Sequence, residues 1–204
     1  MTPTERWQRS LTRAALSDPE GRVLAELTEF YAERHRSYHN LQHIVDCLQM
    51  LEEHASAEHD TVALELALWF HDAIYKPLKG GNELASAVMA DDRLGAMGGE
   101  PALRRKVHRL IMATTHDAEP SDADEALMID CDLSILGRDR DAFERYEAAI
   151  RSEYRLVPGP LFRRKRKAIL ASFLDRTRIF STEPFHERFE ATARGNLAWA
   201  IARL

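Results

Sequence analysis

Apolar side chains recur every three to four positions along most of the chain, and the alternation typical of strands is almost absent. A period near 3.6 residues is the signature of amphipathic helices that bury one face. The pattern therefore predicts an all-α protein, a helical bundle of roughly ten helices with essentially no sheet.

The first half of the chain contains four segments with this period. Helices are expected over about 4–16 and 20–34, from near Asn40, and from about Asp60. The last of these ends in Leu68, Trp69 and Phe70, which is too apolar for a surface helix, so we expect it at the centre of the bundle.

Glycine and proline residues divide the second half. Gly80 and Gly81 break the chain before a helix that reaches about residue 96, and Asn82 is its expected N-cap. Further helices are expected over about 101–115, 124–134, 139–154, 160–180 and 184–201, with an acidic loop at 116–124.

The chain has 204 residues, of which 45% are hydrophobic and 30% charged, and its net charge is −5. This length suits one domain, 1–204, in which a core at about 38–137 carries the candidate chemistry and helices at 139–204 pack on it. The negative charge argues against general affinity for nucleic acid.

Two further absences shape the expected environment. The first residues do not resemble a signal peptide, and no run of about 18 apolar residues occurs, so we expect a cytoplasmic protein without membrane contact. Cys47 and Cys131 are the only cysteines and lack Cys-x-x-Cys spacing, which predicts two buried free thiols.

Histidine and aspartate gather in a few places. His39 and His43 are four residues apart, so they share a helical face and can act at one point. His71-Asp72 follows an apolar helix end, where an ionised carboxylate is costly unless it is paired or bound to a metal.

Asp132 interrupts an apolar run and can point inward, whereas a solvated position is the simpler interpretation of Asp130. Histidine and carboxylate ligands suit several divalent ions, so the sequence leaves Mn, Zn, Ni, Co, Fe and Mg open.

The order of these residues resembles the HD superfamily of metal-dependent phosphohydrolases. The strings Tyr38-His39-Asn40-Leu41-Gln42-His43-Ile44, His71-Asp72 and Cys131-Asp132-Leu133-Ser134 are similar to segments of cyclic-nucleotide phosphodiesterases, which share the HD metal core. The resemblance implies that His43, His71, Asp72 and Asp132 are metal ligands and that His39 protonates the leaving oxygen.

A closer likeness is to small bacterial proteins described as predicted HD phosphohydrolases. It rests on size and on His71-Asp72-Ala73-Ile74-Tyr75 followed by Asn82-Glu83 and Ser86. Phosphodiesterases continue the dipeptide as His-Asp-x-Asp-His, so the Ala73-Ile74-Tyr75 of this chain argues against a fully bimetallic phosphodiesterase site.

Three more residues have a functional and a structural interpretation. His116, in the pair His116-Asp117, either contacts substrate or a second metal or lies in an exposed turn. Glu83 either orients the nucleophilic water or favours a helix N-terminus. Arg166 shares a stripe with Phe162, Ile169 and Phe173, and either receives a substrate phosphate or extends its charge to solvent.

The expected function is therefore hydrolysis of a phosphoester by metal-activated water, with His39, Asp72 and Glu83 as catalytic residues and His116 and Arg166 as substrate contacts. The expected partner is a small phosphorylated substrate, a nucleotide being one candidate. Two alternatives stay open: a di-iron oxygenase of HD type, and a non-catalytic nucleotide-binding HD module. A homodimer is compatible with such bundles, although no residue defines an interface.

Overall fold

The computed structural model describes residues 1–204 and contains ten α-helices, one 3₁₀ turn and no strand. The helices are α1 (Pro3–Ala14), α2 (Arg22–Tyr31), α3 (Leu41–His54), α4 (Thr61–Phe70), α5 (Asn82–Ala96), α6 (Pro101–Ala113), α7 (Ala123–Leu133), α8 (Arg140–Glu153), α9 (Gly159–Leu174) and α10 (Glu183–Ile201), with the 3₁₀ turn η1 (Ser134–Gly137) after α7. The predicted all-α class and the predicted number of helices are confirmed.

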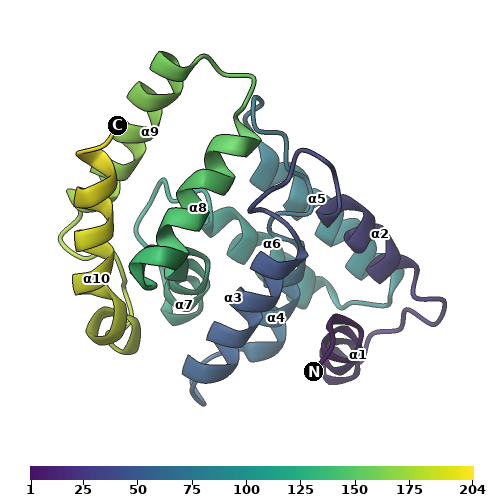
Figure 1. Ribbon diagram of the computed structural model, residues 1–204. Helices are drawn as coiled ribbons and strands as arrows, with labels where there is room; N and C mark the ends of the chain where they lie inside the picture. The colour runs from purple at the N-terminus through teal and green to yellow at the C-terminus, as the bar shows by residue number, and fades with distance from the viewer.

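Helix α4 lies at the centre of the bundle. It packs against α1, α3, α5, α6 and α7, and every residue from Ala63 to Phe70 is buried. Figure 1 shows α1, α2 and α5 on one side of this centre and α8, α9 and α10 on the other. The prediction of a central helix ending in Leu68, Trp69 and Phe70 is confirmed.

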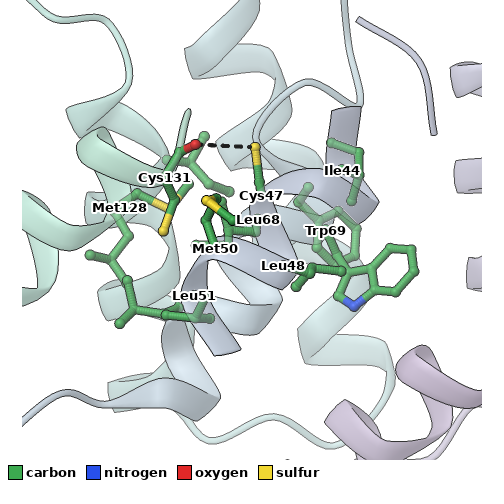
Figure 2. Packing of buried hydrophobic residues seen from close by; sticks show 14 of the residues in the cluster. Ile44, Cys47, Leu48, Met50, Leu51, Leu68, Trp69, Met128 and Cys131 are labelled. Atoms are coloured by element: carbon green, nitrogen blue, oxygen red, sulfur yellow. Dashed lines mark hydrogen bonds between the residues drawn. The ribbon is translucent and has the colours of Figure 1, made fainter. Parts of the chain in front are cut away.

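Helices α3, α4 and α7 meet in a core made largely of aliphatic and sulfur-containing side chains (Figure 2). Both Cys47 and Cys131 are buried free thiols, as the sequence predicts, and the Cys47 thiol lies 3.7 Å from the Cys131 carbonyl oxygen. The three helices that carry the candidate ligands are therefore held by one apolar contact region.

Side-chain caps start α3 and α4 where the sequence places them. Asn40 accepts a hydrogen bond from the Gln42 amide at 2.9 Å, and Asp60 accepts one from the Ala63 amide at 3.1 Å. Such caps satisfy amides that have no partner within the helix. The first cap begins α3 so that His43 lies in its first turn.

The predicted cap of α5 is wrong. Gly81 occupies the N-cap position with φ of 80°, a left-handed conformation that glycine adopts without strain, and Asn82 is the first helical residue. The Asn82 side chain instead closes the preceding loop, since its Oδ1 accepts from the Lys76 amide at 3.1 Å.

Helix α9 is shorter than predicted, because it ends at Leu174 and not near Phe180. The amides of Ile179 and Phe180 donate to the buried carboxylate of Glu190, at 3.0 and 3.1 Å. Tertiary acceptors thus replace the helical ones in this segment.

No helix has the length and apolar character needed to cross a membrane.

Candidate metal centre

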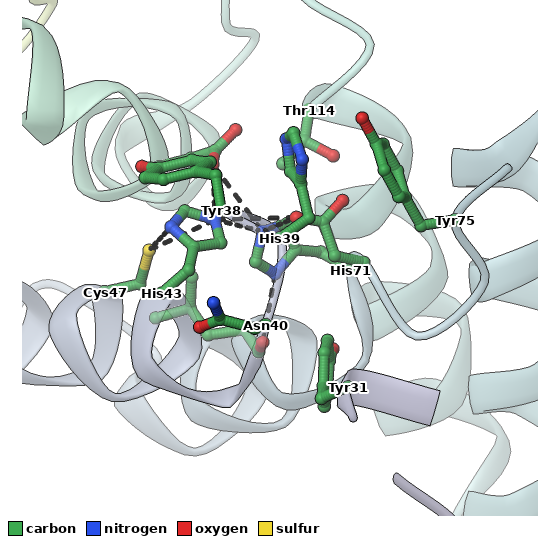
Figure 3. A network of polar contacts seen from close by, with 12 residues as sticks. Tyr31, Tyr38, His39, Asn40, His43, Cys47, His71, Tyr75 and Thr114 are labelled. Atoms are coloured by element: carbon green, nitrogen blue, oxygen red, sulfur yellow. Dashed lines mark hydrogen bonds and ion pairs between the residues drawn. The ribbon is translucent and has the colours of Figure 1, made fainter. Parts of the chain in front are cut away.

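Three chain segments bring two imidazoles and two carboxylates together. His43 lies on α3, His71 and Asp72 directly follow α4, and Asp132 lies near the end of α7. The Nε2 atoms of His43 and His71 are 3.2 Å apart (Figure 3). A group that could hold a metal ion is formed by His43, His71 and Asp132, whose ligand atoms all lie within 4.8 Å of one another.

The carboxylates contact both imidazoles. Oδ1 of Asp132 lies 3.2 Å from Nε2 of His43 and 3.5 Å from Nε2 of His71. Oδ2 of Asp72 lies 3.5 Å from Nε2 of His43 and 3.3 Å from Nε2 of His71. The structure thus brings together the four residues that the sequence named as ligands.

These spacings and this donor set fit a divalent ion. Nitrogen and carboxylate ligands bind such ions at about 2.0–2.2 Å, which holds neighbouring donor atoms roughly 3 to 3.5 Å apart. Both imidazoles are buried, and uncharged histidine with anionic carboxylate is a ligand set used by zinc and by other transition metals. The donor set does not choose among these ions.

Each imidazole is oriented by a contact of its other nitrogen. Nδ1 of His71 lies 3.0 Å from the Leu68 carbonyl oxygen, which accepts a hydrogen bond from this nitrogen. The Nε2 atom of His71 is thereby left free to face the cluster. Nδ1 of His43 lies 3.6 Å from the Cys47 thiol. Contacts of this kind fix ring orientation in metal sites.

The charges of the cluster shift its pKa values in opposite directions. Burial alone lowers the pKa of His71, but the carboxylates of Asp72 and Asp132 outweigh it and raise that pKa well above the ordinary value. Burial raises the pKa of Asp72, and the neighbouring histidines, His71 first, outweigh it and lower that pKa. Without an ion, the cluster therefore retains protons that an ion would displace.

Arg36 joins the two segments that carry these residues. Its side chain is fully buried, and its Nη1 donates to the carbonyl oxygens of His39 and Asp72 at 3.0 and 2.6 Å. Its Nη2 donates to the Ala73 carbonyl at 2.8 Å, and Glu33 accepts from Nε at 3.0 Å. The sequence analysis missed this residue, since no local pattern separates it from a surface arginine.

His39 is paired with a carboxylate that the sequence analysis also missed. Its Nδ1 lies 2.7 Å from Oε2 of Glu153, near the end of α8, and the Tyr75 hydroxyl donates to the same oxygen at 2.8 Å. The other oxygen of Glu153 accepts the amides of Ser37, Tyr38 and His39, at 2.7 to 3.0 Å. Glu153 thus fixes both the ring of His39 and the chain before α3.

This pairing changes the pKa of both groups. Burial raises the pKa of Glu153, but the hydrogen bonds from His39 and from the backbone outweigh it and lower the pKa to about 2. Burial lowers the pKa of His39, while the charges of Asp72 and Glu153 more than compensate and raise it. The arrangement favours a protonated His39.

His116 is not in an exposed turn. It is half-buried, its Nε2 lies 3.1 Å from Oδ2 of Asp132, and its φ of 59° is left-handed, an uncommon conformation for a residue other than glycine. Asp132 therefore lies between His116 on one oxygen and the two candidate ligand histidines, His43 and His71, on the other.

The two aspartates of the Asp130-x-Asp132 pair face different surroundings. Asp132 points into the site as expected, but the interpretation of Asp130 as solvated is wrong, because it is fully buried. Asp130 accepts from the amides of Ser181 and Thr182, at 2.9 and 2.7 Å. Burial raises its pKa to about 6 despite these hydrogen bonds.

A cavity of about 840 Å³ opens beside the cluster. His39, Asp72, Glu83, His116, Asp132 and Arg166, all named from the sequence, line it. Its opposite wall is formed by one face of α9 together with residues of α8. His43 and His71 lie behind this surface, so the carboxylates and His39 are the groups that meet a ligand.

Arg166 and Glu83 differ in how far their roles are defined. Phe162, Arg166, Ile169 and Phe173 all line the cavity, although Ile169 is 48% exposed and not inward. Arg166 does not extend its charge to solvent: it is buried, pairs with Glu147, and donates to the Tyr146 hydroxyl at 2.8 Å. Glu83 lies half-buried in the first turn of α5, so both interpretations of it stay open.

Comparison with known proteins finds no matching family model, no matching curated protein and no matching solved structure for this chain.

Proposed function

We propose that this protein is a metal-dependent phosphohydrolase of the HD type, which cleaves a phosphoester with an activated water. One observation carries the proposal: two imidazoles and two carboxylates from three separate segments converge beside a cavity that His39 also lines. The same residues are those through which the sequence resembles the HD superfamily.

His43, His71, Asp72 and Asp132 would hold the ion. When bound, a divalent ion supplies Lewis acidity, because it lowers the pKa of water and withdraws charge from a phosphoryl oxygen. The ion's identity is left among Mn, Zn, Ni, Co, Fe and Mg. The carboxylates of Asp72 and Asp132 attract the cation, and the contacts of His71 and His43 to Leu68 and Cys47 hold the rings in place.

His39 acts as the general acid in this proposal. Its Nδ1 is occupied by Glu153, so the proton that it can give is on Nε2, and His39 lines the cavity in which a substrate would lie. The raised pKa keeps that proton on His39 until the ester bond breaks and the departing oxygen needs it. Glu83 is the candidate for orienting water, and His116 and Arg166 are candidates for contacting substrate.

The substrate is a small phosphorylated compound, with a nucleotide as one candidate. A cavity of about 840 Å³ lies within the range of about 300–1,000 Å³ that is usual for small-molecule sites. Aromatic residues of α8 and α9, among them Tyr146 and Phe162, offer apolar surface for the organic part of such a compound.

Metal analysis of protein purified without chelator, together with phosphate release from a panel of phosphoesters, tests this function. Asp132→Ala is expected to lose metal and turnover, and His39→Ala to keep metal but lose rate. Asp46→Ala, an exposed acid on the same helix as His43, is the control and is expected to resemble wild type. A metal-free wild type that stays inert after addition of Mn, Co, Ni or Zn would favour the non-catalytic nucleotide-binding module.

The contact of His116 with Asp132 favours one second candidate. Because Asp132 has histidines at both oxygens, His116 could join it in holding a second ion, which a di-iron oxygenase of HD type would require. Anaerobic purification followed by iron analysis and optical spectra separates the candidates. A hydrolase needs neither dioxygen nor a redox-active ion, whereas an oxygenase requires both.

A further inference from the structure

Arg176 lies beside the candidate metal centre, just after the end of α9. Its Nη2 donates to the carbonyl oxygen of His116 at 3.0 Å, and the His116 ring in turn contacts Asp132 at 3.1 Å. Arg176 also lines the cavity of about 840 Å³, together with His39, Asp72 and Asp132. Arg176 therefore borders the space in which a phosphoryl group would meet the centre.

The charge of Arg176 has no partner within the protein. The contacts of its guanidinium are the His116 carbonyl and the ring of Phe173, and no carboxylate lies within ion-pair distance of it. Asp117 lines the same cavity but forms no ion pair. Because burial weakens the hydration of a cation, a half-buried guanidinium without a partner favours an anionic ligand.

Arg166, on the same cavity wall, shows the contrast. Its guanidinium pairs with Glu147 and bonds to the Tyr146 hydroxyl, so its charge is compensated and its donors are largely used. Arg176 uses one donor for His116, and a guanidinium has five. Arg176 is thus the better placed of the two for an anionic ligand.

Contacts to its guanidinium and to its backbone hold Arg176 in place. Its guanidinium carbon lies 4.6 Å from the centre of the Phe173 ring. Its own carbonyl oxygen accepts from Nη2 of Arg194 at 2.8 Å, and the next carbonyl, of Thr177, accepts from the same atom at 2.9 Å. A planar donor group held this way loses little freedom when it binds a phosphate.

We propose that Arg176 is the residue that binds the phosphate of the substrate, with its free donors on the non-bridging oxygens. The inference rests on the proposed function and deepens it, because it gives Arg176 the role that the sequence assigned to Arg166. It also narrows the ligand to one that places an anionic phosphoryl group between the centre and α9. Arg166 then has a structural role, because its contacts with Glu147 and Tyr146 stabilise the wall of the cavity.

Titration calorimetry with inorganic phosphate, on the protein as purified, tests the role directly. Arg176→Gln is expected to bind phosphate about 10- to 100-fold more weakly, since hydrogen bonds to charged groups contribute about 1.5–3 kcal/mol. Arg164→Gln removes the same charge from an exposed position of α9 that does not line the cavity, and its affinity is expected to stay within about twofold of wild type. Metal content and melting temperature check that each variant is folded.

The outcomes separate this inference from the proposed function. Weaker phosphate binding by Arg176→Gln supports the role of Arg176 even if no ester is hydrolysed, in which case the proposed function alone fails. Unchanged binding by Arg176→Gln, or a wild type that binds no phosphate, overturns the inference even if esters are cleaved. If Arg176→Gln does not fold, Arg176→Lys is measured instead, because lysine keeps the positive charge but lacks the planar guanidinium with its several donors. Weaker phosphate binding by Arg176→Lys then supports the role of Arg176, and equal binding overturns it.

Discussion

Nδ1 of His39 lies 2.7 Å from Oε2 of Glu153, a carboxylate 114 residues further along the chain. The Glu153 side chain is inaccessible to solvent, and its hydrogen bonds come from His39, Tyr75 and the backbone before α3. This pair determines both where the proposed acid points and how firmly it holds its proton.

Replacing Glu153 with glutamine is expected to slow phosphoester hydrolysis by about 10- to 100-fold without loss of metal. The reason is the loss of one hydrogen bond between charged groups, which contributes about 1.5–3 kcal/mol. Because His39 must be protonated to act and Glu153 raises its pKa, the alkaline limb of the kcat profile is expected to move to lower pH. A profile that keeps its position while kcat falls would assign Glu153 a structural role only.

The acid stability of the protein should also depend on Glu153. Its pKa is about 2 in the folded protein against an ordinary value of 4.5, so its contribution is fully present above pH 4.5 and is lost as pH falls through about 2. The shift corresponds to about 3 kcal/mol at most. Urea unfolding at pH 5 and pH 3 is expected to show a larger difference between wild type and Glu153→Gln at pH 5. An equal difference at both pH values would contradict the assignment.

Arg36→Met is expected to destabilise the protein by about 2–4 kcal/mol and to weaken metal retention. The change leaves the carbonyl oxygens of His39, Asp72 and Ala73 buried without their donor, and these carbonyls belong to the segments that present the ligands. The exposed neighbour Arg34 provides a matched control, since Arg34→Met is expected to change the unfolding free energy by less than about 0.5 kcal/mol. Chemical denaturation with metal analysis measures both effects, and equal behaviour of the two variants would refute the role of Arg36 in holding the two segments together.

The candidate ligand residues could be singled out because their signals are local. His43 follows a helix cap by three residues, His71 comes at the end of an apolar helix, and Asp132 interrupts an apolar stripe, so periodicity and spacing draw attention to each position. Their role as ligands comes from the resemblance to the HD superfamily. The same local rules give the helix count and the central place of α4.

Other parts of the site depend on contacts between distant segments. Glu153 lies near the end of a helix rich in charge, and only the packing of α8 against the chain before α3 distinguishes it from a solvated glutamate. The burial of Asp130 and the end of α9 could not be predicted for the same reason. The segment after α9 takes its hydrogen-bond acceptors from α7 and α10, which are distant in the sequence. Periodicity gives the face of a helix but not what that face will meet.

Substitutions of Asp130 and of Asp132 are expected to have different effects, the first on stability and the second on metal binding. Asp130→Ala removes the acceptor of the Ser181 and Thr182 amides and should destabilise the protein by about 1–3 kcal/mol while it keeps its metal. Asp132→Ala should lose metal with a smaller effect on the metal-free fold, because its carboxylate is partly accessible. Melting temperatures of the metal-free proteins, together with metal content, measure this; loss of metal in a folded Asp130→Ala would argue against the separation.

Binding of a divalent ion is expected to release about one proton at pH 7. In the metal-free protein the carboxylates of Asp72 and Asp132 raise the pKa of His71 well above 6.5, so the ring is protonated at neutral pH. A histidine must lose that proton before its nitrogen can bind a cation, which makes metal affinity fall as pH is lowered. Calorimetric titration of chelator-treated protein with Zn²⁺ or Mn²⁺, in buffers of different ionisation enthalpy, gives the number of protons released. A binding enthalpy that does not depend on the buffer would show that His71 is already neutral in the metal-free protein, and that the carboxylates of Asp72 and Asp132 do not keep it protonated.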